Sequence, residues 1–557
     1  MTPLSDPTPA TTDRERTAPA TTRSLIRPDA PAAHTLLWQA ALLGLSADAL
    51  LYDGPVGLGL PLWVLVLSLA VLSLTWSAGR RIPREAAAWL GMALLLAACT
   101  TWRHAEALRF FDLLATIGLL GLAAVALRDP ALGIAAPRLR DTLWAGLAIV
   151  RSAARGIVPL AVRELFADHR RTEALGRARV TARLVLIAAT LLLVFGSLLR
   201  SADPIFARLV SLPEFDVESV VSHVLVMGLF AWVAGGWAYG ALMESPASRR
   251  APDRLPITLG TLDVTTALGT LNVLFGAYVL TQLGWFFGGE RFLHATTGLT
   301  AAEYARQGFF QMVWVVALVV PLLLATRAAL AGDAALARRH TMLSVPVVAL
   351  LGAIIVSAAL RMRLYVHYYG LTTERLYTLV FMGWLAIVLA LLAATVLRDR
   401  GRRFVAGSLV SALTLLLGMN VVVPDAVVAR VNVARADSPA ARAPLDLAYL
   451  ASLSGEAVPL AVHATLAAPS ERQRRDPYDA DRRCAAASRL LREWGPASRL
   501  VERRQAPTAW RRWNAGETRA LRAVGANSAA LRQLRHSLCT KGWESRAYGR
   551  ASTTQVD

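Results

Sequence analysis

The segment "RMRLYVHYYGLTTERLY" (residues 361–377) separates two long apolar runs, "LSVPVVALLGAIIVSAAL" (343–360) and "TLVFMGWLAIVLALLAATVL" (378–397). About 20 apolar residues are needed for a helix to cross the roughly 30 Å of hydrocarbon in a bilayer. Both runs are close to that length, so each is predicted to span a membrane. The polar, tyrosine-rich segment between them is then a corner at the membrane surface.

Runs of this kind recur along the 557-residue chain, of which 55% is hydrophobic. Hydrocarbon cannot satisfy an open strand edge, and the alternating pattern of a transmembrane barrel is absent. The sequence therefore predicts an all-α, polytopic transmembrane helical bundle of about eleven spans. The approximate spans are 35–52, 56–76, 86–102, 108–127, 184–199, 220–242, 262–286, 309–326, 342–360, 376–396 and 404–423.

The composition divides the chain into five regions. Residues 1–33 lack an apolar run and are expected to form a disordered tail. A first transmembrane group of about four spans (34–127) is followed by a basic amphipathic segment (128–183). A second group of about seven spans (184–423) precedes a soluble, Arg-rich C-terminal region (424–557), which is predicted to be small and mostly helical.

Arginine is distributed unevenly between the two sets of loops. If the N-terminus is cytoplasmic and the spans alternate, the cytoplasmic segments hold 24 arginines and the opposite loops hold nine. Arg-rich loops are retained in the cytoplasm, so the N-terminus is predicted to be cytoplasmic and the C-terminal region extracytoplasmic. The net charge of +20 then serves contact with an anionic membrane surface, and no nucleic-acid partner is expected.

The stretch "LWAGLAIVRSAARGIVPLAVRELF" (143–166) has two interpretations. A span over 143–162 would bury Arg151 and Arg155, at about 2.5 to 3.5 kcal/mol each. A helix lying on the cytoplasmic surface avoids that cost and binds anionic lipid headgroups. We favour the surface helix; a crossing would reverse the orientation of everything that follows.

Polar residues within the predicted spans are further candidates, because an ionisable group inside a membrane is often functional. Amide side chains in such positions more often join helices than bind ions. Three cysteines are present, and Cys99 lies in an apolar run. Cys484 and Cys539 could form a disulfide if the C-terminal region is extracytoplasmic, and would stay reduced in the cytoplasm. The intramembrane candidates are Asp112, Asp263, Asn272, Gln282 and Asn420.

Several stretches resemble, in order, the bacterial family known as domain of unknown function 4173 (DUF 4173). The likeness extends from about residue 35 to 525, although the C-terminal tail is somewhat longer here. The resemblance implies a multi-pass protein of a bacterial plasma membrane with a soluble tail, and it implies no activity. The stretches are "LLLVFGSLLRSADPIFARLV" (191–210), "GLTAAEYARQGFFQMVWVVALVVPLLL" (298–324), "RLYVHYYGLTTERLYTLVFMGWLA" (363–386), "LDLAYLASLSGEAVP" (445–459) and "WRRWNAGETRA" (510–520).

Two predicted corners begin with the same "GLT", at 298–300 and 370–372. If they are adjacent, their polar side chains converge near the outer membrane surface. Arginines with tyrosines suit a carboxylate or phosphate ligand, whereas the glutamates could neutralise the arginines and form a structural lock. The candidate cluster is Glu303, Tyr304, Arg306, Arg361, Tyr365, Tyr369, Glu374, Arg375 and Tyr377.

No catalytic or cofactor-binding motif is found in the sequence: phosphate-binding glycine loops, HExxH, GxSxG and Cys/His metal spacings are absent. We therefore predict no catalytic residue, cofactor or metal, and assign no enzymatic activity. The first hypothesis is a non-enzymatic envelope scaffold or regulatory protein, with the C-terminal tail meeting envelope components. The alternative is a secondary transporter or a handler of a lipid-linked or anionic substrate, with its site near the outer membrane surface.

Overall fold

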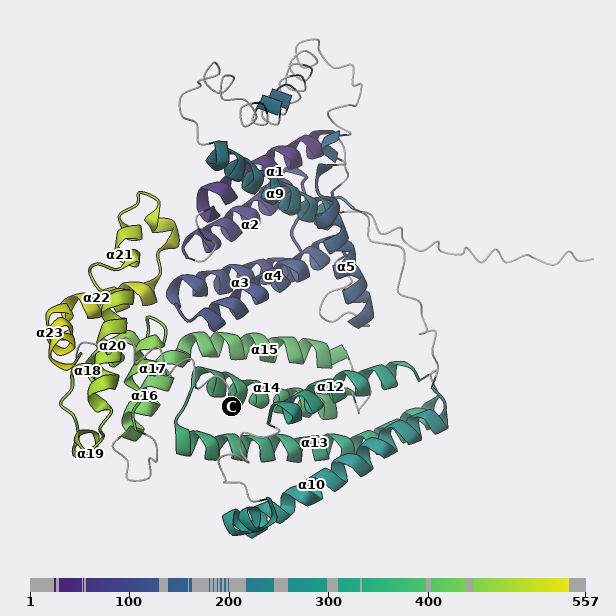
Figure 1. The fold of residues 1–557 in the computed structure, drawn as a ribbon. Coiled ribbons are helices and arrows are strands. Elements are labelled where there is room, and N and C mark those ends of the chain that lie inside the picture. The colour runs from purple at the N-terminus through teal and green to yellow at the C-terminus, as the bar shows by residue number, and fades with distance from the viewer. Residues whose placement is uncertain are drawn as a thin grey trace, which may run out of the picture.

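The computed structural model describes residues 25–26, 30–129 (without 53 and 55–56), 139–162 (without 159), 217–244, 259–297, 309–330, 333–396, 402–436 and 444–539, and isolated residues between 180 and 199. Every regular element in these residues is a helix, which agrees with the predicted all-α class. The helices form three packed groups (Figure 1).

The first membrane group surrounds a core of small and aliphatic side chains, including Leu36, Val64, Leu96 and Ala123. Alanine and glycine let neighbouring helices approach closely; a Cβ added to Gly236 would lie 2.7 Å from the Ser152 carbonyl oxygen. Such close packing is typical of helices in lipid. The helices are α1 (Ala30–Leu51), α2 (Gly59–Ser77), α3 (Arg84–Trp102), α4 (Glu106–Arg128), α5 (Leu139–Arg155) and α9 (Val217–Leu242).

The second membrane group has a separate core that includes Leu268, Leu351 and Leu392. Its last helix, α15, joins the two groups, because Phe404 belongs to this core and Leu413 to the first. Near the end of α15, Met419 also packs against α4. The helices are α10 (Thr261–Thr297), α12 (Phe309–Ala328), α13 (Ala334–Tyr369), α14 (Thr373–Thr395) and α15 (Arg402–Val422).

The third group, which we call the C-terminal group, lies against one end of the membrane helices (Figure 1). Its own core includes Leu450, Val458, Leu490 and Val524. The leucine-rich pattern over 521–538 contributes to this core through Val524 and Leu531, both fully buried. The helices are α16 (Pro424–Ala436), α17 (Leu447–Ser452), α18 (Val458–Leu466), α19 (Glu471–Arg474), α20 (Asp479–Trp494), α21 (Arg499–Arg504), η3 (Ala509–Arg512), α22 (Ala515–Ala526) and α23 (Ser528–Leu538).

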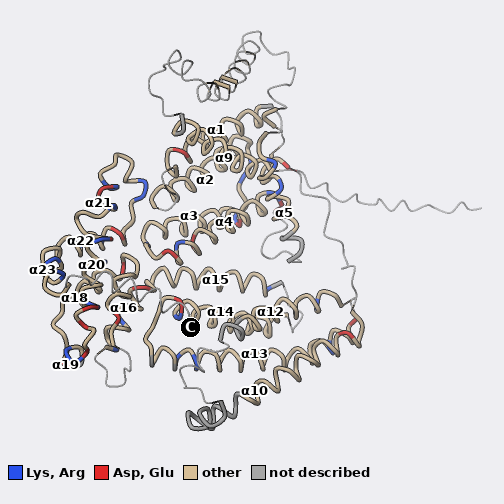
Figure 2. The backbone as a smooth tube through the Cα atoms, viewed as in Figure 1, with Lys and Arg blue, Asp and Glu red and all other residues tan. Residues whose placement is uncertain are grey.

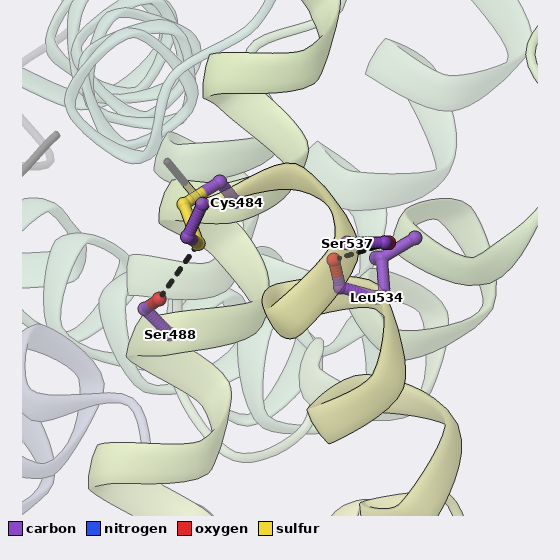
Figure 3. The surroundings of a disulfide bond; sticks show 5 residues. Cys484, Ser488, Leu534 and Ser537 are labelled. Carbon is purple, nitrogen blue, oxygen red and sulfur yellow. Dashed lines mark hydrogen bonds between the residues drawn. A yellow bond between two sulfur atoms is a disulfide. The ribbon is translucent and has the colours of Figure 1, made fainter. Parts of the chain in front are cut away.

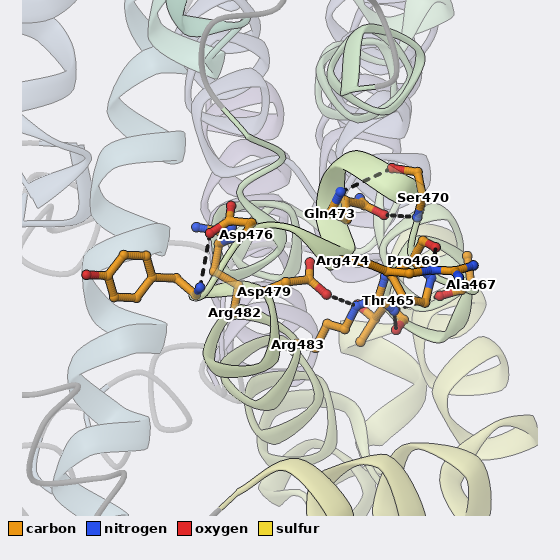
Figure 4. A network of polar contacts seen from close by, with 11 residues as sticks. Thr465, Ala467, Pro469, Ser470, Gln473, Arg474, Asp476, Asp479, Arg482 and Arg483 are labelled. Atoms are coloured by element: carbon orange, nitrogen blue, oxygen red, sulfur yellow. Dashed lines mark hydrogen bonds and ion pairs between the residues drawn. The ribbon is translucent and has the colours of Figure 1, made fainter.

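Polar contacts fix the start of α20 (Figure 4). The buried Arg483 pairs with Asp479 at 2.8 Å and donates to the carbonyls of Thr465 and Ala467 at 2.9 and 2.6 Å. Nearby, Ser470 and Gln473 form a reciprocal capping box at the start of α19. These bonds satisfy helix ends that would otherwise leave polar backbone groups unpaired.

A disulfide joins Cys484 of α20 to Cys539, immediately after α23, with their Cα atoms 5.5 Å apart (Figure 3). Cys484 is fully buried, and the Ser488 hydroxyl lies 3.8 Å from the Cys539 sulfur. The bond therefore fastens the last helix of the C-terminal group to the longest one. Cys99 is a free thiol on α3.

The prediction of about eleven spans is not confirmed. Eight helices in the described residues are long and apolar enough to cross a membrane: Gly59–Ser77, Arg84–Trp102, Glu106–Arg128, Ser219–Leu242, Thr261–Thr281, Ala334–His367, Thr373–Thr395 and Arg403–Val422. The predicted span 309–326 is represented by a shorter apolar helix, Trp314–Ala328. Helix α1 is long enough but carries Gln39 and Asp48, and 184–199 lies mostly outside the described residues.

Helix α1 begins at Ala30, within the region assigned to the disordered tail. Ile26 is buried at the end of α9, where its N–H donates to the carbonyl of Leu242 at 2.9 Å. Ile26 and the first residues of α1 therefore have a defined position, although their composition alone indicated no structure. Residues 1–24 lie outside the described part of the chain.

Charged residues are sparse along the membrane helices and gather at their ends and over the C-terminal group (Figure 2). Helices α2, α4, α13, α14 and α15 each have one end at the C-terminal group (Figure 1). A helix of about 20 residues is about 30 Å long, so the opposite end of such a helix lies about 30 Å from the C-terminal group. At those far ends Arg128 pairs with Glu244 at 3.0 Å, and Arg80 donates to the carbonyl of Leu25 at 2.9 Å. The far side thus carries Arg80 and Arg128, which are predicted to be cytoplasmic.

Helix α5 is amphipathic and is not among the candidate spans. Ile149 and Ser152 pack on α9, and Ser152 donates to Glu244 at 2.8 Å. Arg151 and Arg155 are exposed, so neither is enclosed by protein. Much of the rest of segment 128–183 lies outside the described residues.

Candidate functional site

A cavity of about 890 Å³ lies where the C-terminal group meets two corners of the membrane helices. We call these the α3–α4 corner (residues 103–105) and the α13–α14 corner (residues 370–372). The cavity is therefore at the ends of the spans and not at their middle. It is lined by His104, Ala105, Glu106, Ala107, Met362, Tyr365, Thr372, Thr373, Glu374, Arg375, Tyr377, Thr378, Asp425, Tyr449, Ser452, Leu453, Ser454, Arg489, Glu493 and Trp494.

The sequence itself stops α13 and starts α14 at the α13–α14 corner. Gly370 has a φ of +84°, and an added Cβ would lie 2.7 Å from Asn432 Oδ1. A positive φ of this kind favours glycine, which has no Cβ. Thr372 then caps α14, where its hydroxyl accepts from the N–H of Arg375 at 3.3 Å. A glycine and a threonine two residues later thus end one helix and cap the next.

Asn432 of α16 holds the α13–α14 corner to the C-terminal group. Its Oδ1 accepts from the N–H of Leu371 at 2.9 Å, and its Nδ2 donates to the carbonyl of the same residue at 2.6 Å. Both partners are buried. One amide side chain therefore replaces the two backbone hydrogen bonds that this corner residue lacks.

We expect Asn432→Ala to lower the free energy of unfolding of the C-terminal group by about 2 kcal/mol, because Leu371 keeps two buried backbone groups without partners. Proteolysis of the full-length protein after brief exposure to increasing urea would measure the change. Asn527→Ala is the control, since it removes one local bond, to the Ala523 carbonyl at 2.8 Å. Equal effects of the two substitutions would contradict the role assigned to Asn432.

The α3–α4 corner is attached by two other contacts. Asn514 is buried and donates from Nδ2 to the carbonyls of Thr100 and Arg103 at 3.0 and 2.7 Å, while its Oδ1 caps α22. The His104 N–H donates to Glu456, and His104 Nδ1 accepts from the Gly455 N–H at 3.3 Å. These bonds end α3 and attach it to the C-terminal group.

The His104 ring also packs edge-on against Trp494, with the ring centroids 5.2 Å apart. Burial, reinforced by the nearby Arg109, lowers the pKa of His104 from 6.5 to about 4, although Glu106 and Asp425 oppose the shift. The ring is consequently neutral at pH 7. A neutral ring is also required by its contact with Gly455, because Nδ1 can accept a hydrogen bond only when it carries no proton.

Asp425, buried at the start of α16, organises the wall of the cavity. Its Oδ1 accepts from the Thr373 hydroxyl at 3.2 Å and its Oδ2 from the Ser454 N–H at 3.0 Å. Tyr449 completes this junction by accepting from the Thr373 N–H at 2.9 Å. The α13–α14 corner, the start of α14 and the C-terminal group therefore form one continuous polar wall of the cavity.

The charges that line the cavity are predominantly negative. Four carboxylates, of Glu106, Glu374, Asp425 and Glu493, face two guanidinium groups. Arg489 pairs with Glu493 at 2.9 Å. Arg375 donates to the Gly370 carbonyl and lies over the Tyr365 ring, 4.1 Å from its centroid.

Four of the nine residues in the predicted cluster line the cavity: Tyr365, Glu374, Arg375 and Tyr377. Tyr369 is exposed beside Tyr365, their ring centroids 5.0 Å apart, and Arg361 is buried on α13. Glu303, Tyr304 and Arg306 lie outside the described residues, so their convergence with the other corner stays a prediction. Glu374 and Arg375, both described, form no ion pair with each other, and the lock between the two corners stays a prediction.

The intramembrane candidates take three kinds of position. Asp263 caps α10 by accepting from the Gly260 N–H at 2.8 Å, and Asn272 joins α10 to α13 by donating to the Leu343 carbonyl at 2.9 Å. Asp112 and Asn420 are buried together, with Asn420 Nδ2 donating to Asp112 Oδ1 at 2.8 Å. The side chain of Gln282 lies outside the described residues.

Comparison with known protein families identifies the family of this chain. A family model described as a domain of unknown function, DUF4153, matches residues 90–464, which is more than half of the sequence. The chain belongs to the DUF4153 family. The match covers both corners and ends within α18, before α20 and α23.

The resemblance to DUF 4173 is therefore wrong as to the family, though right in pointing to a domain of unknown function. It was based on apolar runs and on corners rich in arginine and tyrosine, and these occur in many membrane proteins because the membrane interface favours them. No curated protein and no solved structure matches the chain. The DUF4153 assignment identifies a family and no activity.

Proposed function

We propose that this DUF4153 protein is a regulatory membrane protein that binds an amine-bearing molecule in the cavity beneath its C-terminal group. The observation that carries the proposal is the excess of carboxylates around an aromatic-walled cavity. Arg489 and Arg375 are both engaged in other contacts. Glu106 and Glu374 form no ion pair or side-chain hydrogen bond within the described residues. Arg109 is a charged neighbour of Glu106 but forms no ion pair with it in the described residues. Carboxylates without a salt-bridge partner favour a cation.

The aromatic lining supports the same class of ligand. Tyr365, Tyr377, Tyr449 and Trp494 are among the residues that line the cavity. Ring faces attract ammonium groups, by about 0.5 to 2 kcal/mol each. An anionic ligand, the class expected from the arginines alone, would meet the carboxylates without a free guanidinium to bind it.

The position of the cavity favours binding over transport. Its lining comes from the first turns of α4 and α14, the last turns of α13 and the C-terminal group. Carriers place their sites near the middle of the membrane, where discontinuous helices meet. A site at the rim, covered by a soluble group, is suited to sensing a ligand and passing its effect to that group.

We propose that this cavity faces out of the cell and that the membrane is a bacterial plasma membrane, with the N-terminus in the cytoplasm. Two observations support this orientation: arginines such as Arg80, Arg128 and Arg338 lie at the ends of the spans away from the C-terminal group, and the C-terminal group contains a disulfide. Structural disulfides persist in oxidising compartments. On the cytoplasmic side, α5 and its exposed arginines would meet anionic lipid.

The binding proposal is tested with choline and ethanolamine as soluble probes and with glycerol phosphate as the anionic comparison. We expect the two amines to raise the melting temperature of the purified protein, and Glu106→Gln/Glu374→Gln to weaken their binding at least tenfold, about 1.4 kcal/mol. Glu502→Gln, on α21 outside the cavity, is the matched control. Stabilisation by glycerol phosphate instead of the amines would overturn the proposal.

A free amine and a lipid headgroup share this chemistry, and native mass spectrometry from mixed bilayers separates them. Selective retention of phosphatidylethanolamine over phosphatidylglycerol identifies a lipid ligand. Retention of neither, together with choline binding, identifies a free solute. Loss of retention in the Glu106→Gln/Glu374→Gln variant ties either ligand to the cavity.

A second candidate function is an envelope scaffold, favoured by the attachment of the C-terminal group to the membrane helices through Asn432 and Asn514 and by the disulfide within that group. A deletion strain examined for envelope stress separates the two candidates. Full rescue by the Glu106→Gln/Glu374→Gln variant would favour the scaffold. Rescue by the native chain but not by this variant would favour ligand binding.

A further inference from the structure

Two buried side chains, Asp112 of α4 and Asn420 of α15, leave one oxygen each without a hydrogen-bond partner. Asp112 is fully buried and Asn420 is 5% exposed. Asn420 Nδ2 donates to Asp112 Oδ1 at 2.8 Å and also to the Leu416 carbonyl at 3.1 Å. The unpartnered atoms are Asp112 Oδ2 and Asn420 Oδ1.

A charged carboxylate in this position has no salt-bridge partner in the described residues. Arg103, a neighbouring cation, donates its Nε to the backbone carbonyl of Asn420 at 2.6 Å and forms no ion pair with Asp112. Arg109, one turn before Asp112, has Glu106, Glu456 and Glu517 as its charged neighbours. The other titratable neighbours, Cys99 and Tyr377, carry no positive charge.

Both orphan oxygens are lone-pair acceptors as long as the carboxyl group is ionised, and an isolated buried charge is costly. One added proton changes both conditions. A protonated Asp112 becomes a donor from Oδ2. The acceptor without a partner, Oδ1 of Asn420, belongs to the side chain whose Nδ2 already donates to Asp112 Oδ1. A carboxylic acid and a primary amide can form two hydrogen bonds to each other in this way.

We propose that Asp112 and Asn420 form a proton-binding site within the membrane, in which Asp112 Oδ2 carries the proton and donates it to Asn420 Oδ1. No covalent bond other than the O–H bond forms, and the proton comes from water. The ligand of this site is the proton itself. The inference does not rest on the proposed function of the cavity.

The site has a consequence for the architecture, because α15 joins the two membrane groups. Met419, next to Asn420, packs with Leu108 and Ala105 of the α4 end. Loss of the proton would remove one of the two bonds between α4 and α15 and leave a charge in the same contact. The contact between the two groups would then depend on the protonation state of Asp112, on the helix that follows the corner carrying His104.

Infrared spectroscopy of the reconstituted protein at pH 7 tests the proposal, since a protonated carboxyl group has a carbonyl stretch that shifts in deuterium oxide. We expect such a band in the native chain, its loss in Asp112→Asn, and its retention in Asp263→Asn, which alters the exposed cap of α10. Asp112→Asn is expected to fold, because two amides can also pair reciprocally. A native spectrum without a band that depends on Asp112 would overturn the proposal.

Asn420→Leu provides a second measurement on the same band. Removal of the amide takes away the hydrogen bonds of the acid, so the Asp112 band should move to higher frequency while its intensity remains. If the band does not move, Asn420 is not the partner and the proposed pair is refuted. An ionised Asp112 held by a bound sodium ion would give no such band in either protein, and that result too refutes the proposal.

Discussion

Replacing Cys484 and Cys539 together with alanine is expected to lower the free energy of unfolding of the C-terminal group by roughly 4 kcal/mol. The two residues are 55 positions apart, and closing a loop of that length restricts the unfolded chain strongly. Alanine is preferred to serine at Cys484 because that side chain is fully buried, and a hydroxyl there would need a partner. Hydrogen exchange of the α20 and α23 amides in the full-length protein would measure the loss.

Cys99→Ala is the control for this measurement, since Cys99 is a free thiol on α3 and closes no loop. It should leave exchange in α20 unchanged. A double variant whose α20 amides are as protected as those of the native chain would contradict the stabilising role of the bond. Reducing the native protein should reproduce the effect of the double variant, because both remove the same constraint.

The same pair of cysteines reports the orientation of the protein in the cell. If the C-terminal group lies outside the cytoplasm, alkylation of whole cells after acid quenching should find Cys484 and Cys539 oxidised. Both thiols modified without prior reduction would place the group in the reducing cytoplasm. That outcome would reverse the orientation argued from arginine and would make α5 extracytoplasmic.

Local features of the corner could be predicted from sequence, because each depends on residues close together in the chain. Gly370 and Thr372 mark the end of one helix and the start of the next, and apolar runs mark most of the spans. Long-range pairing could not be predicted in this way. Asn432 bonds to Leu371 across 61 residues, and Asp112 to Asn420 across 308.

Some residues that line the cavity could be predicted from the sequence, and others could not. Tyr365, Glu374 and Arg375 were predicted as candidates because they are polar residues between apolar runs. His104, Asp425 and Trp494 were missed, since each comes from a segment without a distinctive pattern and matters only through packing. A signal was nevertheless present for Asp425: it follows the last apolar run directly, where a buried carboxylate can bond the corners of neighbouring spans.

The second large effect expected is a pH dependence of the attachment between the α3–α4 corner and the C-terminal group. Between pH 6.5 and about 4 the unfolded chain binds a proton at His104 and the folded chain does not. The contribution of His104 to the free energy of unfolding is therefore fully present above pH 6.5. It is lost as the pH falls toward 4, by up to about 3 kcal/mol. Protonation of Nδ1 also removes the hydrogen bond from the Gly455 N–H, because two N–H donors then face each other. Limited proteolysis and hydrogen exchange at residues 103–105 and 454–456 should show loosening between pH 6 and 4.5.

His104→Gln isolates the cause, because its side-chain oxygen can accept from Gly455 and does not titrate in this range. The variant should be less stable than the native chain at pH 7, having lost the ring contact with Trp494, yet change much less with pH. His463→Gln on α18 is the control and should keep the native pH profile. If the His104→Gln profile retained the full acid-induced loss, protonation of other groups would account for it instead. Acid would then release the C-terminal group from the α3–α4 corner without any part played by the histidine.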